Sequence, residues 1–331
     1  MRASLLFRDE RMPLLVQPLM ERDLSEVMQT HRLELRARLL EHGALLFRGF
    51  DMRGMEDFAG FLQATGRERM NYVYRSTPRS VVADRIFTAT EYPPSQEIVL
   101  HNENAYQRDW PLEIALCCLT CPASGGATPL GDMRRITASI GPGLVDRFNA
   151  CGVRYFRHYR NYVDLPWEVV FQTSEPEQVA EFCRAEGIEY EWLDAQTLRT
   201  VQVAQGTAHH PATGERLYFN QAHLFHVSSL GPAAARSLIH LFGRDRLPRH
   251  ACYGDGQEIA ECDLGRVREA FRRHAVSFPW QQGDVLLVDN MQVAHGREPY
   301  RGERKVLVAL LEPHSRNAPG GESKAPRGEN S

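Results

Sequence analysis

Apolar and polar residues follow two different periods along the chain and divide it into helical and extended stretches. Residues 23–41 place apolar side chains three and four positions apart, as one face of a helix requires, and 55–66 repeat this spacing up to a glycine. From 95 to 135 the pattern changes to short apolar runs such as "EIVLHNENAY" and "LEIALCCLTCP", punctuated by Gly and Pro. Two strong strands, "DVLLVDN" and "KVLVALL", follow near the C-terminal end. The pattern predicts a mainly β fold with helical additions, in a barrel or sandwich.

The middle of the chain, about 136–275, mixes helical and irregular signals. Helices are predicted in "ITASIGPGLVDRFNACG", "EPEQVAEFCRAEG" and "GPAAARSLIHLFG". We interpret this stretch as a mixed insertion within a single domain that spans 1–313. Residues 314–331 are polar, contain Gly and Pro and lack apolar periodicity, so we expect a disordered tail there.

Composition narrows the class of protein further. The 331 residues are 43% hydrophobic and 24% charged, with a formal net charge of -3, which is typical of a soluble globular protein. The chain has no strong positive charge for binding nucleic acid. No stretch approaches the roughly 20 apolar residues of a membrane span, and the N-terminus lacks the apolar core of a signal peptide. A cytoplasmic location is therefore predicted.

Seven cysteines include a tight group at Cys117, Cys118 and Cys121. No second Cys or His pair follows at zinc-finger spacing, and the group lies in an apolar, strand-like run. We interpret these residues as buried, reduced thiols.

The pair His101 and Glu103 stands at the end of a predicted strand. Side chains in an extended chain repeat every two residues, so both would point to one side and offer a nitrogen and an oxygen to one metal. His295, directly after the strand near the C-terminal end, supplies a third ligand. Two histidines and one carboxylate with open coordination positions are the ligand set of non-haem Fe(II) oxygenases. The H-x-E pattern alone is weak evidence, because a strand histidine is commonly structural.

Two further residues suit a co-substrate that carries two carboxylates. Thr128 lies in "GGATPLGD", and Arg304 follows His295 at the start of the last β run. A guanidinium group pairs bidentately with a carboxylate, and a hydroxyl adds one more donor.

The ordered set "HNE", "GGATPLGD", "HPATGERLYFN" and "GDVLLVDNMQVAHGREPYRGERKVLVAL" resembles the TauD/TfdA family of Fe(II)/2-oxoglutarate-dependent dioxygenases over about 45–312. Within it, "RSTPR", "TATEYPPSQEIVLHNENAY" and "DNMQVAHGREPYRGERKVLVA" are similar to the SyrP-like branch, near clavaminate synthase and asparagine oxygenase. The resemblance implies a double-stranded β-helix (jelly-roll) core, with 2-oxoglutarate and O2 as co-substrates. It also implies that Fe(II) is held by His101, Glu103 and His295. Thr128 and Arg304 would then bind the distal carboxylate of 2-oxoglutarate.

Two departures from the family pattern affect this assignment. Many members have Asp where this chain has Glu103, and this difference leaves the chemistry of the metal ligand unchanged. A carboxylate at this position disfavours halogenation as the reaction. The gap between His295 and the anchoring arginine is shorter than in several relatives. Arg297 and Arg301 are therefore rival anchors, although Arg304 is favoured because it opens the strand.

The resemblance also implies a class of substrate. The branch favours an amino acid, free or bound to a peptidyl carrier protein, hydroxylated at an unactivated carbon, with the β-carbon favoured, in nonribosomal-peptide or related natural-product biosynthesis. Desaturation or epoxidation at the same site is the alternative, and a non-catalytic metal-binding jelly-roll protein is an alternative of another class. In the TauD pattern a second arginine, four residues beyond the co-substrate arginine, meets the substrate's anion. Val308 stands there, which favours a substrate carboxylate that is masked or bound elsewhere.

Several polar residues are candidates for substrate contact or for support of the metal ligands. The candidate contacts are Arg75, Arg79, Asn104, Tyr106 and Asn220. The two arginines fit a solvated turn at Thr77-Pro78 equally well. Asp289 and Asn290 either orient His295 or cap a turn. Four further histidines, at His209, His210, His223 and His226, are interpreted as structural or pocket residues and not as a second metal site.

Overall fold

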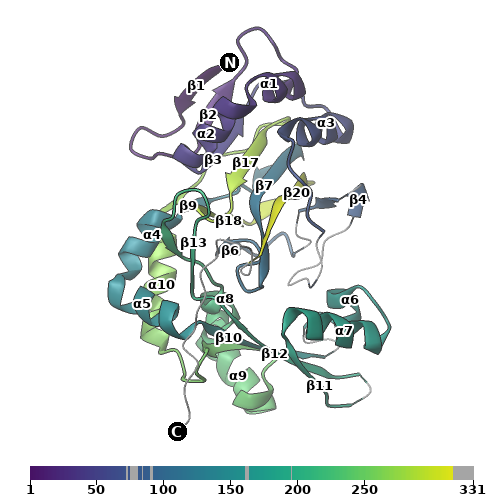
Figure 1. The fold of residues 1–331 in the computed structure, drawn as a ribbon, viewed down its shortest axis with the longest axis vertical. Coiled ribbons are helices and arrows are strands. Elements are labelled where there is room, and N and C mark those ends of the chain that lie inside the picture. Colours follow the sequence, from purple (N-terminus) through teal and green to yellow (C-terminus); the bar gives the residue numbers. More distant parts are fainter. Residues whose placement is uncertain are drawn as a thin grey trace. The chain divides into compact units, whose positions relative to one another are not determined.

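The computed structural model describes residues 1–71, 74, 81–83, 85–89, 92–160, 164–194 and 196–315. The candidate substrate contacts Arg75 and Arg79 lie outside these residues, as does most of the predicted tail. The chain forms two compact units (Figure 1). The first unit comprises Met1–Glu103, Pro111–Met133 and Phe271–Pro313, and the second comprises Asn104–Trp110, Arg134–Ala270 and His314–Ser331.

Two β-sheets build the first unit. The strands of the larger sheet are β1 Arg2–Leu5, β2 Leu14–Gln17, β3 Ala44–Phe47, β4 Val81–Ala83, β5 Ile86–Thr88, β7 Asp109–Thr120, β17 Val285–Asp289 and β20 Lys305–Ser315. Those of the smaller sheet are β6 Ile98–His101, β9 Leu130–Asp132, β16 Ala275–Val276 and β18 Val293–Arg297. A short pair is formed by β8 Ser124–Gly125 and β19 Tyr300–Arg301. The orders are β1-β2-β3-β17-β7-β20-β5-β4 and β16-β9-β18-β6.

The strands of the larger sheet bury both of their faces. Along β17, Val285 and Leu287 belong to one hydrophobic core, whereas Leu286 and Val288 belong to another. The first core lies under three helices, α1 Leu24–Thr30, α2 Arg32–His42 and α3 Met55–Thr65 (Figure 1). The second core joins the larger sheet to residues of β9, β16 and β18 in the smaller sheet. This two-sheet sandwich explains why the strand sequences are continuous apolar runs without alternation.

The helical pattern at 23–41 forms two helices instead of one. Asp23 caps α1, and its carboxylate accepts hydrogen bonds from the backbone N–H groups of Ser25 and Glu26. The backbone leaves helical geometry at His31 (φ -109°, ψ 20°), and α2 ends at Gly43 with φ 76°. The helix predicted at 55–66 is confirmed as α3.

The second unit contains a four-stranded sheet in the order β11-β12-β10-β15 and a hairpin of β13 and β14. The strand bounds are β10 Val153–Tyr159, β11 Glu189–Trp192, β12 Leu198–Ala204, β13 Thr207–His209, β14 Arg216–Tyr218 and β15 Arg249–Tyr253. Helices wholly or mainly in this unit are α4 Met133–Ile140, α5 Pro142–Cys151, α6 Trp167–Phe171, α7 Pro176–Glu186, α8 Ala222–Phe225, α9 Pro232–Phe242 and α10 Glu261–Arg273, with 3-10 turns η1 Val227–Leu230 and η2 Arg244–Arg246.

This sheet is missing from the sequence prediction, which gave only helices and irregular segments at 136–275. Buried polar side chains account for the omission. Arg157 in β10 is 1% exposed, and Thr200 and Gln202 in β12 are also buried. They interrupt the apolar alternation by which half-buried strands are recognised.

The end of the described chain also differs from the prediction. β20 continues to Ser315, so the first two residues assigned to a disordered tail belong to a strand, and residues 316–331 are not described. No helix in the described part of the chain has the length and apolar character needed to cross a membrane.

Candidate metal and co-substrate site

Antiparallel pairing of β6 with β18 brings two histidines together. His101 and His295 are direct cross-strand partners, and their ring centroids are 4.7 Å apart. Cross-strand partners project to the same face of a sheet. The residue after His295 must be small, because a Cβ at Gly296 would lie 2.5 Å from the carbonyl oxygen of Ile98. Gly296 therefore permits the close approach that pairs the two imidazoles.

Glu103 reaches the same place by a different route from the predicted one. β6 ends at His101, and Glu103 lies in the turn that follows, so the two-residue repeat of an extended strand does not apply. The next residue, Asn104, has φ 56°, in the left-handed region. Glu103 Oε2 nevertheless lies 3.8 Å from His295 Nε2, and one ligand atom from each of the three side chains lies within 4.8 Å of the others. The turn produces the convergence that strand geometry was expected to give.

Asn290 holds this turn in place. Its Oδ1 accepts the backbone N–H of Glu103 at 2.7 Å, and its Nδ2 donates to the Glu103 and Pro111 carbonyl oxygens at 3.0 and 2.8 Å. Its own carbonyl accepts from Asn102 Nδ2 at 2.6 Å. Asn290 is fully buried. It therefore fixes the backbone of Glu103.

Asp289 has the other role that the sequence left open. Its Oδ1 accepts the backbone N–H groups of Met291 and Gln292, both at 3.0 Å. Asp289 therefore caps the turn between β17 and β18.

We expect Asn290→Ala to weaken metal binding on the order of tenfold, because residues that orient a metal ligand typically contribute 10–100-fold to affinity. Titration with Fe(II) without oxygen measures this, and thermal unfolding reports the separate loss of stability. Asp289→Asn, which keeps an acceptor for the turn, serves as the matched control. Unchanged affinity for Fe(II) in Asn290→Ala would show that the turn at Glu103 does not need the hydrogen bonds of Asn290 to position the carboxylate.

A hydrogen bond of His101 shows which of its ring nitrogens carries the proton. Nδ1 lies 2.9 Å from the carbonyl oxygen of Val99. A carbonyl can only accept, so Nδ1 carries the ring proton and Nε2 keeps its lone pair. Two atoms bound to one ion at about 2.1 Å each can be at most about 4.2 Å apart, and the 3.8 Å between Glu103 Oε2 and His295 Nε2 is within this limit. The Glu103–His295 pair therefore fits a single divalent ion, and the ligand atom of His101 lies within 4.8 Å of both.

A second cluster, His226, His250 and Glu258 in the second unit, has similar spacing but the opposite tautomers. The backbone N–H of Ser228 donates to His226 Nδ1 at 3.1 Å, and that of Val227 donates to His250 Nδ1 at 3.4 Å. Burial lowers the pKa of His226 to about 4 and also lowers the pKa of His250, so both rings are neutral at neutral pH. Each ring proton then lies on Nε2 and faces Glu258, at 3.7 and 3.4 Å. The two Nε2 atoms that face Glu258 therefore carry protons in this arrangement, unlike Nε2 of His101.

Arg304 lies beside the glycine turn that precedes Thr128. Its Nε donates to the Gly126 carbonyl oxygen at 3.0 Å. Gly126 has φ 73°, and a Cβ there would lie 2.7 Å from Pro122 Cγ and 3.2 Å from Arg304 Cδ, so only glycine admits the arginine. Burial, and then the nearby charge of Arg297, lower the pKa of Arg304. Among the described residues no carboxylate pairs with Arg304, so an anionic ligand would complete its environment.

The two rival arginines are placed differently. Arg297 donates to three backbone carbonyls, those of Tyr92, Pro93 and Gln96, at 2.9, 2.8 and 2.7 Å. Its guanidinium group is thus used to hold the loop before β6. Arg301 is exposed on β19. The geometry favours Arg304 as the co-substrate anchor. Thr128 itself is buried, and its hydroxyl accepts the indole N–H of Trp280 at 3.1 Å, a contact that the sequence analysis missed.

Comparison with known proteins assigns the chain to a family. Residues 10–310 match the family described as "Taurine catabolism dioxygenase TauD, TfdA family". The chain belongs to the TauD/TfdA family. It is accordingly a non-haem Fe(II)/2-oxoglutarate-dependent dioxygenase, with O2 as the second co-substrate. The resemblance read from the sequence is confirmed.

Two known proteins are similar to most of the chain. The chain is 40% identical to the dapdiamide synthesis protein DdaC of Enterobacter agglomerans over 275 residues, which are 83% of this chain and 84% of DdaC. It is 27% identical to a clavaminate synthase-like protein of Arabidopsis thaliana over 297 residues, 86% of each chain.

Solved structures support the fold. PvcB from Pseudomonas aeruginosa superposes with a TM-score of 0.55 at 15% identity, over 97% of this chain and 94% of PvcB. AAD-2, solved with Mn(II) and N-oxalylglycine, gives 0.53 at 11% identity, over 95% of this chain and 97% of AAD-2. The predicted jelly-roll core of the TauD/TfdA family is confirmed.

The candidate substrate contacts within the described residues differ in how their side chains are used. Asn220 donates to the Gly206 carbonyl oxygen at 2.6 Å and accepts the Ala222 N–H at 3.0 Å, so its amide holds the backbone. Tyr106 is buried, and its hydroxyl accepts from Gln107 Nε2 at 2.9 Å. Asn104 is buried, and its amide atoms have no hydrogen-bond partner within the described part of the chain. Asn104 is therefore the strongest of the three candidates.

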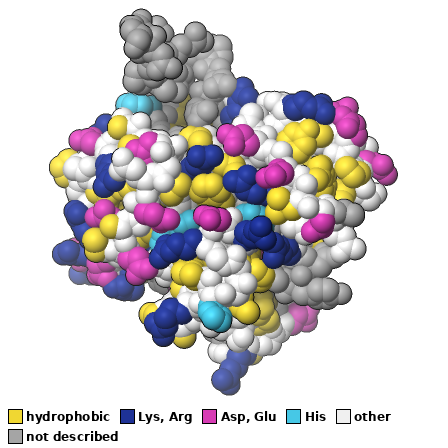
Figure 2. Space-filling model, turned by 90° about the horizontal axis from the view of Figure 1, so that it is seen from below, with side chains coloured by type: hydrophobic (Ala, Val, Ile, Leu, Met, Phe, Trp, Pro, Cys, Tyr) yellow, Lys and Arg dark blue, Asp and Glu magenta, His cyan; other side chains and the backbone are white. Residues whose placement is uncertain are grey.

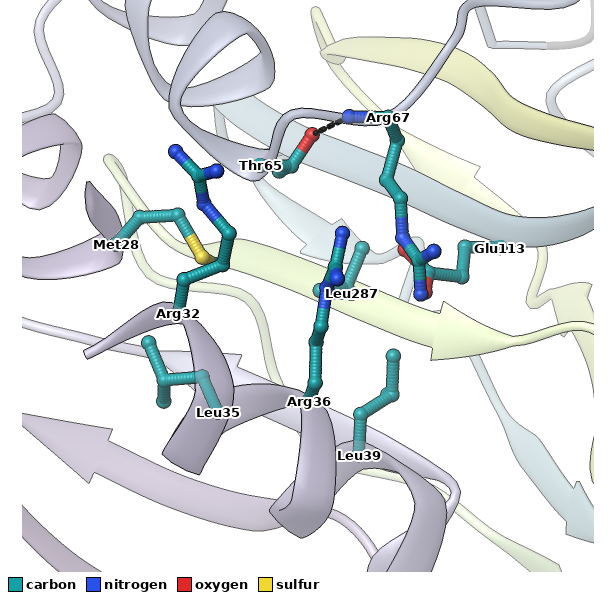
Figure 3. A pocket seen from close by; sticks show the side chains of 9 residues that line it. All are labelled: Met28, Arg32, Leu35, Arg36, Leu39, Thr65, Arg67, Glu113 and Leu287. Atoms are coloured by element: carbon teal, nitrogen blue, oxygen red, sulfur yellow. Dashed lines mark hydrogen bonds and ion pairs between the residues drawn. The ribbon is translucent and has the colours of Figure 1, made fainter. Parts of the chain in front are cut away.

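A small cavity lies away from this site, on the helical side of the larger sheet (Figure 3). The cavity is lined by Arg32, Arg36 and Arg67. Leu287, which belongs to the hydrophobic core under the three helices, also lines it. Arg67 pairs with Glu113 at 2.6 Å. The cavity measures about 10 Å³, room for little more than one water molecule. It is too small for a co-substrate and lies on the opposite face of the sheet from the sandwich core.

The cysteines agree with the sequence prediction in part, because Cys121, unlike the other two of its group, is only half-buried. Cys117 and Cys118 are buried free thiols, and burial raises the pKa of Cys117 to about 12. Cys118 Sγ and Cys121 Sγ are 3.5 Å apart. On the face drawn in Figure 2, Lys and Arg side chains are interspersed with Asp, Glu and hydrophobic side chains.

Proposed function

We propose that this dioxygenase hydroxylates an unactivated carbon, with the β-carbon favoured, of an amino acid or a carrier-bound aminoacyl group in natural-product biosynthesis. The convergence of His101, Glu103 and His295 carries the catalytic part of the proposal, because it supplies the ligand set of this chemistry with open coordination positions. The similarity to DdaC, a dapdiamide synthesis protein, supports the natural-product part. A cytoplasmic location remains a prediction.

Each residue of the site has a defined task in this proposal. His101, Glu103 and His295 hold the metal, and the Val99 carbonyl keeps the His101 ring in the tautomer that binds it. Bound iron, with 2-oxoglutarate and O2, supplies the oxidation of the C–H bond.

The protein must also orient the co-substrate. The Arg304 guanidinium group and the Thr128 hydroxyl bind the distal carboxylate of 2-oxoglutarate, so the opposite end is directed to the metal. Thr128 is buried and Arg304 is half-buried, so competing water is partly excluded and these charge-assisted contacts are strengthened.

The nature of the substrate is inferred from what the site lacks. Val308 is 3% exposed in the core of the sandwich, at the position where the TauD pattern has its second arginine. A small substrate with a strong anionic group would find no cation there. We infer that its carboxylate is masked as an amide or thioester, or bound by Arg75 or Arg79. The amide of Asn104 offers a donor and an acceptor to an amide-like group.

Mass spectrometry of candidate substrates tests this proposal. Free amino acids and aminoacyl-carrier proteins are incubated with the enzyme, Fe(II), 2-oxoglutarate and O2, and succinate is measured in parallel. We expect a gain of one oxygen on an aminoacyl substrate, with the carrier-bound form favoured. Loss of two hydrogens would indicate desaturation, and oxygen gain at a carbon–carbon double bond would indicate epoxidation. Oxidation of taurine or an aryloxy acid, with none of any aminoacyl substrate, would contradict the substrate class.

A further inference from the structure

The contact between Trp280 and Thr128 carries an inference about co-substrate binding. Trp280 Nε1 lies 3.1 Å from Thr128 Oγ1, and both side chains are buried. We propose that Trp280 is a positioning residue for 2-oxoglutarate: its indole N–H fixes the Thr128 hydroxyl so that the hydroxyl proton is directed to the distal carboxylate. This inference rests on the proposed role of Thr128 as a co-substrate anchor.

The chemistry of the two groups decides the direction of the hydrogen bond. An indole N–H can only donate, whereas a hydroxyl has one proton and two lone pairs. The contact therefore occupies a lone pair of Thr128 Oγ1 and turns the hydroxyl proton away from the indole ring. Among the residues that the structure describes, none accepts this proton. An anionic acceptor would complete the network, and its contact with the hydroxyl would be charge-assisted.

Arg304 lies at the same turn. Its Nε donates to the carbonyl oxygen of Gly126, two residues before Thr128. Residues 126–128 thus make one contact to the guanidinium group, through the Gly126 carbonyl oxygen, and one to the indole, through the Thr128 hydroxyl. A carboxylate beside this turn can receive an N–H and an O–H together, with the directions of both set in advance. Such preorganisation raises affinity because less freedom is lost on binding.

The loop that carries Trp280 is itself held firmly. The Asp284 carboxylate accepts from Arg48 Nε at 3.0 Å and Nη2 at 2.7 Å, and from the Gln281 N–H at 2.8 Å. Arg48 Nη2 also donates to the carbonyl oxygen of Pro279 at 2.9 Å. These bonds fix the backbone on both sides of Trp280, so the indole N–H has a defined direction.

Trp280 also packs in the sandwich core, with its ring centroid 6.0 Å from that of Phe278, so the experiment must separate positioning from packing. A double-mutant cycle separates the two. If Trp280 acts through the Thr128 hydroxyl, replacing Trp280 has no further effect on affinity once that hydroxyl is removed, whereas an effect of packing persists. The probe is N-oxalylglycine, and calorimetry measures its affinity for the Mn(II)-loaded protein without turnover. The variants are Trp280→Phe, Thr128→Val, the double variant and Phe278→Leu as the packing control.

We expect Trp280→Phe and Thr128→Val each to weaken N-oxalylglycine binding on the order of tenfold, the usual size of one hydrogen bond to a charged group. The double variant should bind as Thr128→Val does, and Phe278→Leu should bind as the wild type does. In turnover, Trp280→Phe should raise the KM for 2-oxoglutarate and leave kcat nearly unchanged.

If Trp280→Phe does not fold, incorporation of β-(3-benzothienyl)alanine at position 280 keeps the shape of the ring and removes only the N–H. An equal further loss of affinity in the double variant, or no loss in either variant at position 280, would overturn the positioning role while Thr128 remained an anchor. Unchanged affinity in Thr128→Val would instead overturn the anchor assignment on which this inference rests.

Discussion

Replacing His101, Glu103 or His295 by alanine is expected to abolish succinate formation and to weaken Fe(II) binding by more than about a hundredfold. The reason is that each change removes an atom bound to the metal, and even residues that merely orient such an atom contribute about 10–100-fold. Metal titration without oxygen measures affinity, and succinate formation measures turnover. We expect the fold to persist, because the three side chains meet one another at a ligand-binding site and do not fill either hydrophobic core.

The second histidine cluster supplies a matched control for these variants. Glu258→Ala removes a carboxylate that faces two histidines at comparable distances, and Glu258 is largely exposed. We expect this variant to bind Fe(II) as the wild type does. Glu103→Asp should keep part of the activity, because it retains the carboxylate and shortens its reach by one methylene group. Full activity in any of the three alanine variants would contradict the assignment of the ligands.

The second large effect is expected at Arg304. Arg304→Ala should raise the KM for 2-oxoglutarate on the order of a hundredfold, since loss of a charge-assisted pair with a desolvated carboxylate costs about 2–3 kcal/mol. Arg301→Ala is the control, because Arg301 is exposed on β19 and should leave this KM nearly unchanged. Steady-state kinetics with 2-oxoglutarate as the varied substrate measures both. A large effect in Arg301→Ala with none in Arg304→Ala would move the anchor to β19.

Much of the first unit can be predicted from sequence because its helices have apolar periodicity and its central strands are strongly apolar. The strands β17 and β20 are continuous apolar runs, and both of their faces are buried between helices and a second sheet. The sheet of the second unit escapes prediction for the converse reason, since Arg157 and Gln202 are polar residues at buried strand positions. Such residues are stabilised by tertiary partners, and a local pattern does not reveal them.

The candidate site was likewise only partly predictable from the sequence. The residue types of the proposed ligand set were readable, and Arg304 was favoured over its rivals because it stands beside a predicted strand, which begins one residue later as β20 at Lys305. The geometry that brings Glu103 close to His101 and His295 could not be predicted from the sequence. It depends on a hydrogen bond with Asn290, which is 187 positions away. The Trp280–Thr128 contact likewise joins positions 152 apart. The tautomer of His101 depends on the carbonyl oxygen of Val99, and no residue pattern specifies that hydrogen bond.

The most direct test of the account is a crystal structure of the protein with Mn(II) and N-oxalylglycine, the pair captured in AAD-2. We expect one metal ion bound by His101 Nε2, Glu103 and His295, with the distal carboxylate of N-oxalylglycine on Arg304 and Thr128. A metal ion at His226, His250 and Glu258 with none at His101, or a carboxylate on Arg301 instead of Arg304, would contradict the account.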